Sequence, residues 1–192
     1  MATTTTRKVI LSMQMTLDGF VAGLNNEMDW IKSSDDEWNI IFNDLESVDT
    51  LLLGSKMYPE YVTFWKSQLT DPSADRNLVE FAKIAEKTQH IVFSKTMKDV
   101  AWGNTRIATD ALSEIKKLKQ QPGKNIVAWG GATFASFLIN TGLINEYWLT
   151  VNPILLGEGK PLFKDVKVRK DLEFIHSQPL QSGMVTLRYK SK

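Results

Sequence analysis

Four short segments of this sequence carry the residue types that can bind a phosphorylated cofactor: glycine, small hydroxyl side chains and lysine. Each follows an apolar run with the character of a buried β-strand. They are residues 16–19 (TLDG), 54–56 (GSK), 94–96 (SKT) and 130–133 (GGAT). Glycine lets the backbone approach a phosphate closely, and the N–H groups at the start of a helix attract its negative charge. We therefore expect these segments to form one phosphate-binding cradle.

The glycine pair Gly130 and Gly131 gives the strongest of these signals. The apolar run 125–129 precedes the pair, and an apolar segment with helical spacing follows it up to a glycine stop at Gly142. A strand, a glycine turn and a helix in this order leave backbone N–H groups free at the positive end of the helix. The alternative interpretation is a tight turn that only requires two glycines.

The phosphate-binding motifs that the sequence contains, and those that it lacks, indicate which type of cofactor would bind. The G-x-G-x-x-G dinucleotide fingerprint and the Walker phosphate loop are both missing. The second strand ends in Gly54, Ser55 and Lys56 instead of an acid. A lysine with hydroxyls suits the 2′-phosphate of NADPH better than the free ribose diol of NAD. In the alternative interpretation, Lys56 and Lys95 are solvated surface charges.

Composition argues against several other classes of protein. The net charge of +1 gives no electrostatic reason to bind nucleic acid or an anionic membrane. Cysteine is absent, and His90 and His176 lie far apart without ligand-like spacing, so we expect no metal site. The apolar stretch near the start is too short for a signal peptide or a membrane span, which predicts a cytoplasmic protein. Residues 1–7 are expected to be a disordered lead-in.

The elements that must position the four segments alternate between strand and helix. Apolar runs predict strands, and apolar residues spaced by three and four predict helices. The order predicts a single α/β domain over residues 1–192, with a mostly parallel sheet and an antiparallel C-terminal edge. In such sheets ligands bind beyond the carboxyl ends of the strands, where the four segments lie. The expected strands are 8–15, 50–53, 89–93, 105–108, 125–129, 146–153, 172–178 and 184–189, and the expected helices are 35–48, a short one near 54–56, 78–87, 110–119 and one after Gly131.

Several longer motifs resemble one known superfamily. They are MTLDGFVAG at 15–23, the tryptophan at Trp30, LLLGSKMY at 51–58, IVFSKT at 91–96 and the long stretch that begins WGGATFASFL at Trp129 and ends at Phe163. Together they resemble the dihydrofolate-reductase-like superfamily. The closer resemblance is to the C-terminal reductase domain of the riboflavin-biosynthesis deaminase-reductase, in a stand-alone branch. It covers nearly the whole chain.

The resemblance implies a three-layer fold, with helices on both faces of the sheet, and an NADPH-dependent reductase. Its substrate would be a pteridine- or pyrimidine-like heterocycle or a ring-opened sugar attached to one. Carried over by position, the cofactor pyrophosphate would lie along Gly130, Gly131, Ala132, Thr133 and Phe134. Its adenosine end would lie near Gly54, Ser55, Lys56, Ser94 and Lys95, and its nicotinamide near Gln14, Ala22 and Trp30.

Two acids are candidate catalytic residues. Asp18 would face the junction of cofactor and substrate, where it could place a proton or an ordered water. The alternative for Asp18 is an Asx-turn with Gly19. Asp35 lies five residues beyond Trp30, where dihydrofolate reductases carry their pterin-binding carboxylate; its alternative role is a helix N-cap.

One departure from the family bears on the substrate. Riboflavin reductases usually place a substrate-contacting glutamate before the glycine pair, and this chain has Trp129 there. We therefore expect a flatter or less polar substrate than a ribityl phosphate. Dihydrofolate reductase activity and a nucleotide-binding module without catalysis are the alternatives. The segment 146–151, EYWLTV, carries an aromatic pair that could join two copies into a homodimer; the alternative is burial of that pair under a loop.

Overall fold

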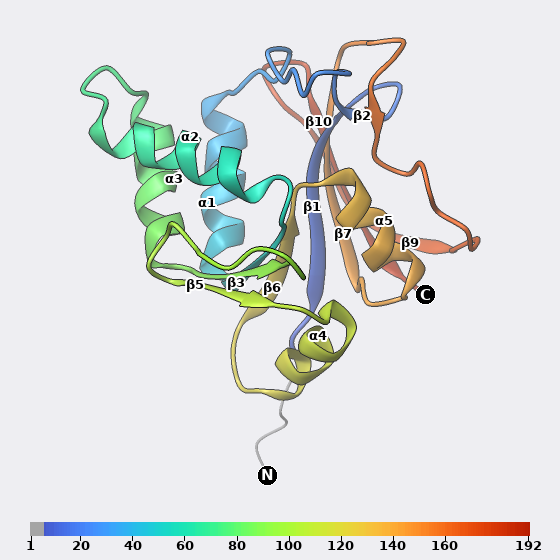
Figure 1. Cartoon of the computed structure of the whole chain (residues 1–192). Helices are drawn as coiled ribbons and strands as arrows, with labels where there is room; N and C mark the ends of the chain where they lie inside the picture. The colour runs from blue at the N-terminus through green and yellow to red at the C-terminus, as the bar shows by residue number, and fades with distance from the viewer. Residues whose placement is uncertain (1–5) are drawn as a thin grey trace.

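Eight strands form one twisted sheet in the order β5-β4-β3-β6-β1-β7-β10-β9 in the computed structural model, which describes residues 6–192 (Figure 1). The first six strands in that order run parallel, and β10 and β9 complete the sheet with antiparallel pairs. This confirms the predicted mostly parallel sheet with an antiparallel C-terminal edge. The strands are β1 (Val9–Thr16), β3 (Val48–Gly54), β4 (Gln89–Phe93), β5 (Thr105–Ala108), β6 (Asn125–Trp129), β7 (Glu146–Asn152), β9 (Leu172–Pro179) and β10 (Val185–Ser191).

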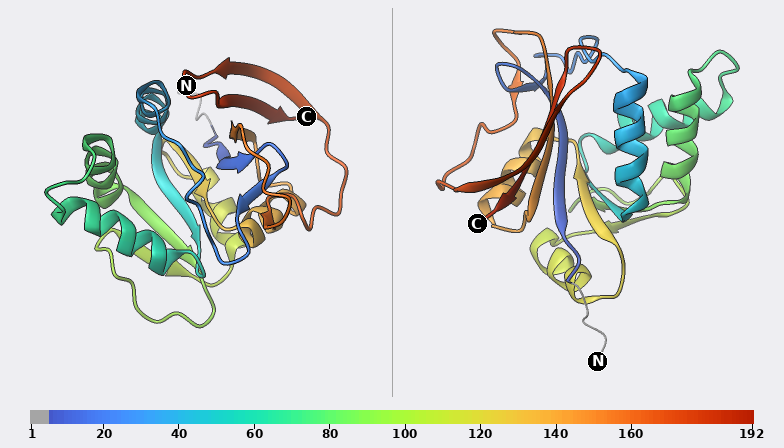
Figure 2. Two further views of the ribbon diagram at one scale, coloured as in Figure 1. Left: turned by 90° about the horizontal axis from the view of Figure 1, so that it is seen from above. Right: turned by 180° about the vertical axis from the view of Figure 1, so that it is seen from behind.

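Helices cover both faces of the sheet (Figures 1 and 2). Three of them gather on one face and two on the other, so the described part of the chain has three layers. Within the strands, alternate residues enter different cores: Leu52 and Ile91 join the core beneath α4 and α5, whereas Leu53 and Val92 join the other. The helices are α1 (Asp35–Glu46), α2 (Tyr58–Thr70) and α3 (Arg76–Lys87) on the first face, and α4 (Ala111–Gln120) and α5 (Ala132–Asn140) on the second.

Some element boundaries differ from the prediction for local reasons. Helix α1 ends at Glu46, because Val48 is already the first residue of β3. The short helix expected near residues 54–56 is the longer α2, which begins after the turn, at Tyr58. Helix α3 begins two residues earlier than predicted, since the Asp75 carboxylate accepts a 2.8 Å hydrogen bond from the Asn77 amide and caps the helix there.

A second, two-stranded sheet lies beyond the large one and was absent from the prediction. It pairs β2 (Phe20–Ala22) with β8 (Lys160–Pro161) in antiparallel fashion. Strands of three and two residues are too short to show a periodic pattern. The pair nevertheless links the segment after β1 to the segment after β7, near the predicted cradle.

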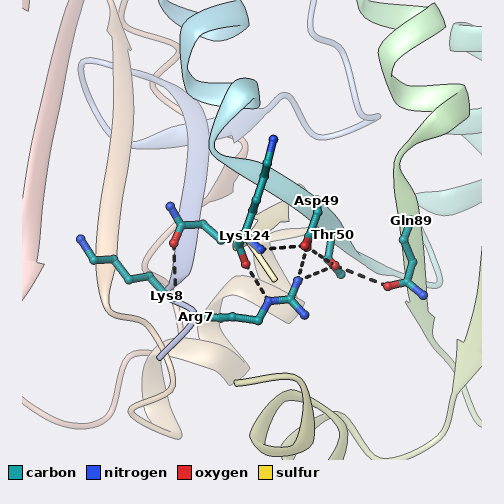
Figure 3. Close-up of polar contacts among 7 residues, drawn as sticks. Arg7, Lys8, Asp49, Thr50, Gln89 and Lys124 are labelled. Carbon is teal, nitrogen blue, oxygen red and sulfur yellow. Dashed lines mark hydrogen bonds and ion pairs between the residues drawn. The ribbon is translucent and has the colours of Figure 1, made fainter. Parts of the chain in front are cut away.

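The start of the described chain is fastened to the amino end of the sheet (Figure 3). The buried Arg7 guanidinium pairs with the Asp49 carboxylate and donates hydrogen bonds to Thr50 Oγ1 at 2.8 Å and to the Lys124 carbonyl at 2.6 Å. Residues 1–5 of the predicted lead-in lie outside the described residues. For Arg7, the prediction of a disordered lead-in is wrong, because its side chain is buried and hydrogen-bonded.

The aromatic pair that was expected at a dimer contact lies in an inner strand of the sheet. Strand β7 runs between β1 and β10, so neither of its edges is free. Tyr147 is buried, whereas Trp148 is half-buried and lines a cavity. Both residues lie in an inner strand of the sheet, and only Tyr147 is buried. None of the helices in the described part of the chain is long and apolar enough to cross a membrane.

Candidate active site

The parallel strands bring three of the four predicted cradle segments to one edge of the sheet. Gly54 pairs with Phe93 across β3 and β4, and Leu52 pairs with Ala128 across β3 and β6. The residues that follow each strand therefore emerge side by side. These are the segments at 54–56, 94–96 and 130–133.

The turn at Gly130 and Gly131 requires glycine at both positions. Their φ angles are 83° and 84°, in the left-handed region that residues with a side chain rarely adopt. A Cβ atom at Gly130 would also overlap the sulfur of Met57. Gly131 is the N-cap of α5, and the amides of the first helical turn have no acceptor within the helix. Ala132, Thr133 and Phe134 form that turn, so this edge offers backbone N–H groups to an anion.

The other cradle residues differ in how accessible they are. A Cβ atom at Gly54 would lie 3.3 Å from the Cβ of Phe134, so Gly54 lets α5 pack closely on the end of β3. Ser94 is buried, and its hydroxyl accepts hydrogen bonds from the amides of the two turn residues 96 and 97. Ser55 is half-buried, whereas Lys56 and Lys95 are exposed. The two lysines are thus available to a phosphate group.

A cavity lies between α1 and the sheet, on the face that α1 covers. Its volume is about 80 Å³, and all the empty space between the lining residues, including the part open to solvent, is about 530 Å³. The cavity has apolar walls and a few polar groups, as ligand pockets do. The predicted residues Gln14 and Trp129 both line it. The other lining residues are Ser12, Met13, Glu37, Ile41, Asp44, Leu45, Val48, Val127, Trp148 and Thr150.

Glu37 is the buried acid of this cavity. Its Oε1 accepts a 2.9 Å hydrogen bond from Gln14 Nε2, and Gln14 Oε1 in turn accepts a 3.0 Å bond from Asn152 Nδ2. Burial raises the pKa of Glu37 to about 7, and the nearby Asp36 carboxylate adds to the rise. Both protonation states are therefore populated near neutral pH. The side-chain oxygen of Asn152, Oδ1, is buried without a hydrogen-bond partner.

Sequence reasoning missed Glu37, although two signals pointed to it. Glu37 lies four and eight residues before Ile41 and Leu45, so it shares their inward stripe on α1. Ser12 and Gln14 alternate with apolar residues of a strand that is otherwise buried on both faces. Polar side chains at inward positions of two facing elements indicate a polar cavity between them.

Asp18 ties two loops together. Its carboxylate accepts hydrogen bonds from the Thr16 hydroxyl at 2.6 Å, the Gly157 amide at 2.8 Å and the Leu156 amide at 3.1 Å. The bond from Thr16, with these amide bonds, holds the pKa of Asp18 below its usual value. Asp18 therefore stays ionised at neutral pH and joins the turn after β1 to the loop after β7.

The structure does not bring Asp35 to the cavity. Asp35 is the first residue of α1, after the N-cap Ser34, and its carboxylate accepts a 3.2 Å hydrogen bond from Asn77 Nδ2 on α3. Asp35 borders a separate surface hollow with Trp38 and Leu78. The carboxyl groups that α1 presents to the cavity belong to Glu37, two residues later, and to Asp44.

Two further predicted residues lie between β1 and α1 in the chain. Trp30 is buried, and its indole N–H has no hydrogen-bond partner. Ala22 lies in β2, and its carbonyl oxygen closely approaches the backbone of Gly159. Across residues 6–192, no group of three or more His, Cys, Asp or Glu side chains is placed to hold a metal ion.

Comparison with known sequences gives one family and two bacterial relatives. The family model of the RibD C-terminal domain matches residues 7–186. The uncharacterized protein YyaP of Bacillus subtilis (strain 168) is 36% identical over 183 residues, which cover 95% of this chain and 94% of that protein. The uncharacterized protein YwjB of the same organism is 29% identical over 163 residues, which cover 83% of this chain and 84% of YwjB.

Solved structures share the fold. A candidate riboflavin biosynthesis protein from Shewanella sp. PV-4 has a TM-score of 0.76 at 22% identity, over 96% of this chain and 99% of that one. A diaminohydroxyphosphoribosylaminopyrimidine deaminase/5-amino-6-(5-phosphoribosylamino)uracil reductase from Thermotoga maritima has a TM-score of 0.66 at 16% identity. That match covers 97% of this chain and 57% of the Thermotoga chain.

Proposed function

The chain belongs to the family of RibD C-terminal domains, and we propose that it is an NADPH-dependent reductase of a small heterocyclic substrate. The observation that carries this proposal is the buried Glu37 carboxyl, held by Gln14 in a cavity whose lining includes Trp129, the residue before the glycine turn. An acid with a pKa near neutrality, placed beside an anion-binding strand edge, suits a hydride transfer that also needs a proton.

The residues at the strand edge fit the cofactor. Gly130 and Gly131 leave room for a phosphate, and the first-turn amides of α5 (Ala132, Thr133 and Phe134) can bind the pyrophosphate. Near Gly54, the Ser55 hydroxyl and the ammonium groups of Lys56 and Lys95 would hold the 2′-phosphate, with Ser94 supporting its turn. Gln14, Ala22 and Trp30 remain our proposal for the nicotinamide end. When bound, NADPH supplies the hydride.

The protein's own part in the reaction is to bind, orient and protonate the substrate. We propose that Glu37 donates a proton to the ring or carbonyl atom next to the carbon that accepts the hydride. Gln14 orients the Glu37 carboxyl, and Trp129 forms an aromatic wall. Asp18, which stays ionised, is the weaker proton donor, and we propose that it holds the loops at the mouth of the site. No contact of Asp35 supports its predicted substrate role.

The test compares cofactor binding with cofactor oxidation. Nicotinamide fluorescence titration should show NADPH binding at micromolar concentration, and absorbance at 340 nm should show NADPH oxidation with at least one pterin, pyrimidine or quinone acceptor. Turnover of dihydrofolate alone would favour the dihydrofolate reductase alternative. Tight NADPH binding without oxidation by any acceptor would instead favour a non-catalytic module.

We also propose that the protein forms a homodimer, through β9 instead of the segment 146–151, which lies in an inner strand. Every residue of β9 is exposed, including the apolar Leu172, Phe174 and Ile175, and one edge of this strand is unpaired. Exposed apolar edge strands pair readily with another chain. Light scattering should give twice the mass of the chain, and Phe174→Lys combined with Ile175→Lys should give the monomer mass. A wild-type monomer at 50 µM would refute the proposal.

A further inference from the structure

Two side chains that line the cavity, Asp44 of α1 and Trp148 of β7, share a contact with Arg188 of β10, which lies behind them. The Arg188 guanidinium pairs with Asp44 Oδ2 at 2.6 Å, and its central carbon lies 4.3 Å from the centre of the Trp148 ring. Arg188 and Trp148 are also direct partners across β7 and β10. We call these three residues the end wall.

The end wall is neutral overall because its two charges pair with each other. The Arg188 and Asp44 side chains are only 19% and 25% exposed. The positive charge of Arg188 is therefore shared between Asp44 and the face of the Trp148 ring, an arrangement that weakens its attraction for a third group.

The rest of the cavity lining is unfavourable to an anion. It contains two carboxyl groups, Glu37 and Asp44, and among the described lining residues it contains no lysine or arginine. Ile41, Leu45 and Val48 add apolar side chains to the same lining. A phosphate placed in this cavity would lose its hydration and meet carboxyl groups without gaining a free cation.

We propose that the end wall determines substrate specificity: the enzyme takes a flat heterocycle that carries no phosphate or carboxylate at the end lying against Trp148. Asp44 is the specificity-determining residue, because it pairs with Arg188, the cation that lies against the Trp148 ring. This inference rests on the proposed reductase function, since it concerns the substrate of the same cavity.

The test uses a matched pair of compounds that differ in one phosphate. They are 5-amino-6-(5-phosphoribosylamino)uracil, which the name of the Thermotoga relative includes, and the same compound without its phosphate. Calorimetry on the full chain with saturating NADP⁺ gives the ratio of their dissociation constants. We expect the wild type to bind the phosphate-free compound at least tenfold more tightly.

Two variants should shift this ratio in opposite directions. Asp44→Asn frees Arg188 and should reduce the preference at least tenfold, whereas Arg188→Gln leaves Asp44 unpaired and should increase it. Adding Arg188→Gln to Asp44→Asn should cancel the gain in phosphate binding. Glu46→Gln, at an exposed carboxyl on the same helix, is the matched control and should leave the ratio unchanged.

The outcomes separate this inference from the proposed function. Equal or tighter binding of the phosphorylated compound by the wild type overturns the inference, as does an unchanged ratio in both folded variants. Binding of neither compound at millimolar concentration overturns it too. If the ratios behave as expected but no acceptor oxidises NADPH, the reductase function fails while the specificity of the cavity stands. If the Asp44→Asn variant does not fold, the ratio of dissociation constants measured for Arg188→Gln tests the inference by itself.

Discussion

The side-chain amide of Gln14 donates a 2.9 Å hydrogen bond to the carboxyl of Glu37, and so joins the central strand of the sheet to helix α1 inside the cavity. Glu37 is buried, and this burial raises its pKa to about 7. The first two predictions concern this carboxyl group: its proposed role as proton donor and its effect on stability.

Replacing Glu37 by Gln should lower kcat by about 10² or more, because general acid catalysis contributes at least that much in typical enzymes. The protonated acid predominates below its pKa, so wild-type turnover should fall as the pH rises through about 7. The variant should lack this pH dependence and bind NADPH as the wild type does. Steady-state NADPH oxidation from pH 5.5 to 9 measures both effects, and a variant with wild-type kcat would contradict the role of Glu37.

The same substitution should stabilise the folded protein at alkaline pH. Folding raises the pKa of Glu37 from 4.5 to about 7, so its charged form is disfavoured in the folded state. Wild-type stability should therefore decrease as the pH rises from 4.5 through 7, by up to about 3 kcal/mol. Urea unfolding at pH 5 and pH 8 tests this: Glu37→Gln should gain stability over the wild type at pH 8 only.

The buried His90 should have the opposite effect. Its Nε2 lies 3.0 Å from the Tyr61 hydroxyl, and burial lowers its pKa to about 4. The folded state thus keeps His90 neutral, and stability should be lost as the pH falls from 6.5 towards 4, by up to about 3 kcal/mol. In the wild type the effects of His90 and Glu37 offset each other between pH 4.5 and 6.5. In the Glu37→Gln variant, urea unfolding at pH 7 and pH 5 should show only the loss of stability that His90 causes. An unfolding midpoint that is the same at both pH values would contradict this prediction.

Gly130→Ala should weaken cofactor binding at least tenfold and lower stability. Alanine at a φ of 83° costs about 1–2 kcal/mol, and its Cβ would also displace the side chain of Met57. Gly103→Ala is the matched control, because nothing lies within 4 Å of the added Cβ and its φ is not in the left-handed region. Nicotinamide fluorescence titration and thermal unfolding of both variants give the comparison. Similar affinities for NADPH would argue against a cofactor site at this turn.

The Arg7 contacts predict a variant that loses stability without losing function. Arg7→Gln removes charged hydrogen bonds to Asp49 and Thr50 and should cost about 2 kcal/mol. The site lies at the opposite ends of the strands, so kcat in the assay should not change. Arg169→Gln, whose side chain is 90% exposed beside Asp171, should change the unfolding free energy by about 0.5 kcal/mol or less. Equal losses in the two variants would refute this account.

The sequence was informative where local patterns dominate. Strands β4, β5 and β6 have the predicted bounds, because each is a short apolar run between turn residues. Features that depend on distant partners escaped prediction. The pairing of β2 with β8, the Arg7 contacts to Asp49 and Lys124, and the place of β7 between β1 and β10 all join segments far apart in the chain.

The candidate site shows the same division. The positions of Gly130 and Gly131 followed from the strand, turn and helix that surround them. The acid was expected at Asp35, at the start of an acidic helical turn, whereas Glu37 lies in the cavity; its place on the inward stripe of α1 indicates this only when the packing of α1 on β1 is considered. Two positions along a helix correspond to a rotation of about 200°, so Asp35 and Glu37 point to nearly opposite sides of α1.

The sheet order has a consequence for the folding of this protein during its synthesis on the ribosome. Strand β1 is the earliest to be synthesised, yet its two neighbours are β6 and β7, the first of which begins 116 residues after Val9. The middle of the sheet can therefore close only after roughly three quarters of the chain has emerged. Until then, β1 has two unsatisfied edges and must be shielded from pairing with other nascent chains.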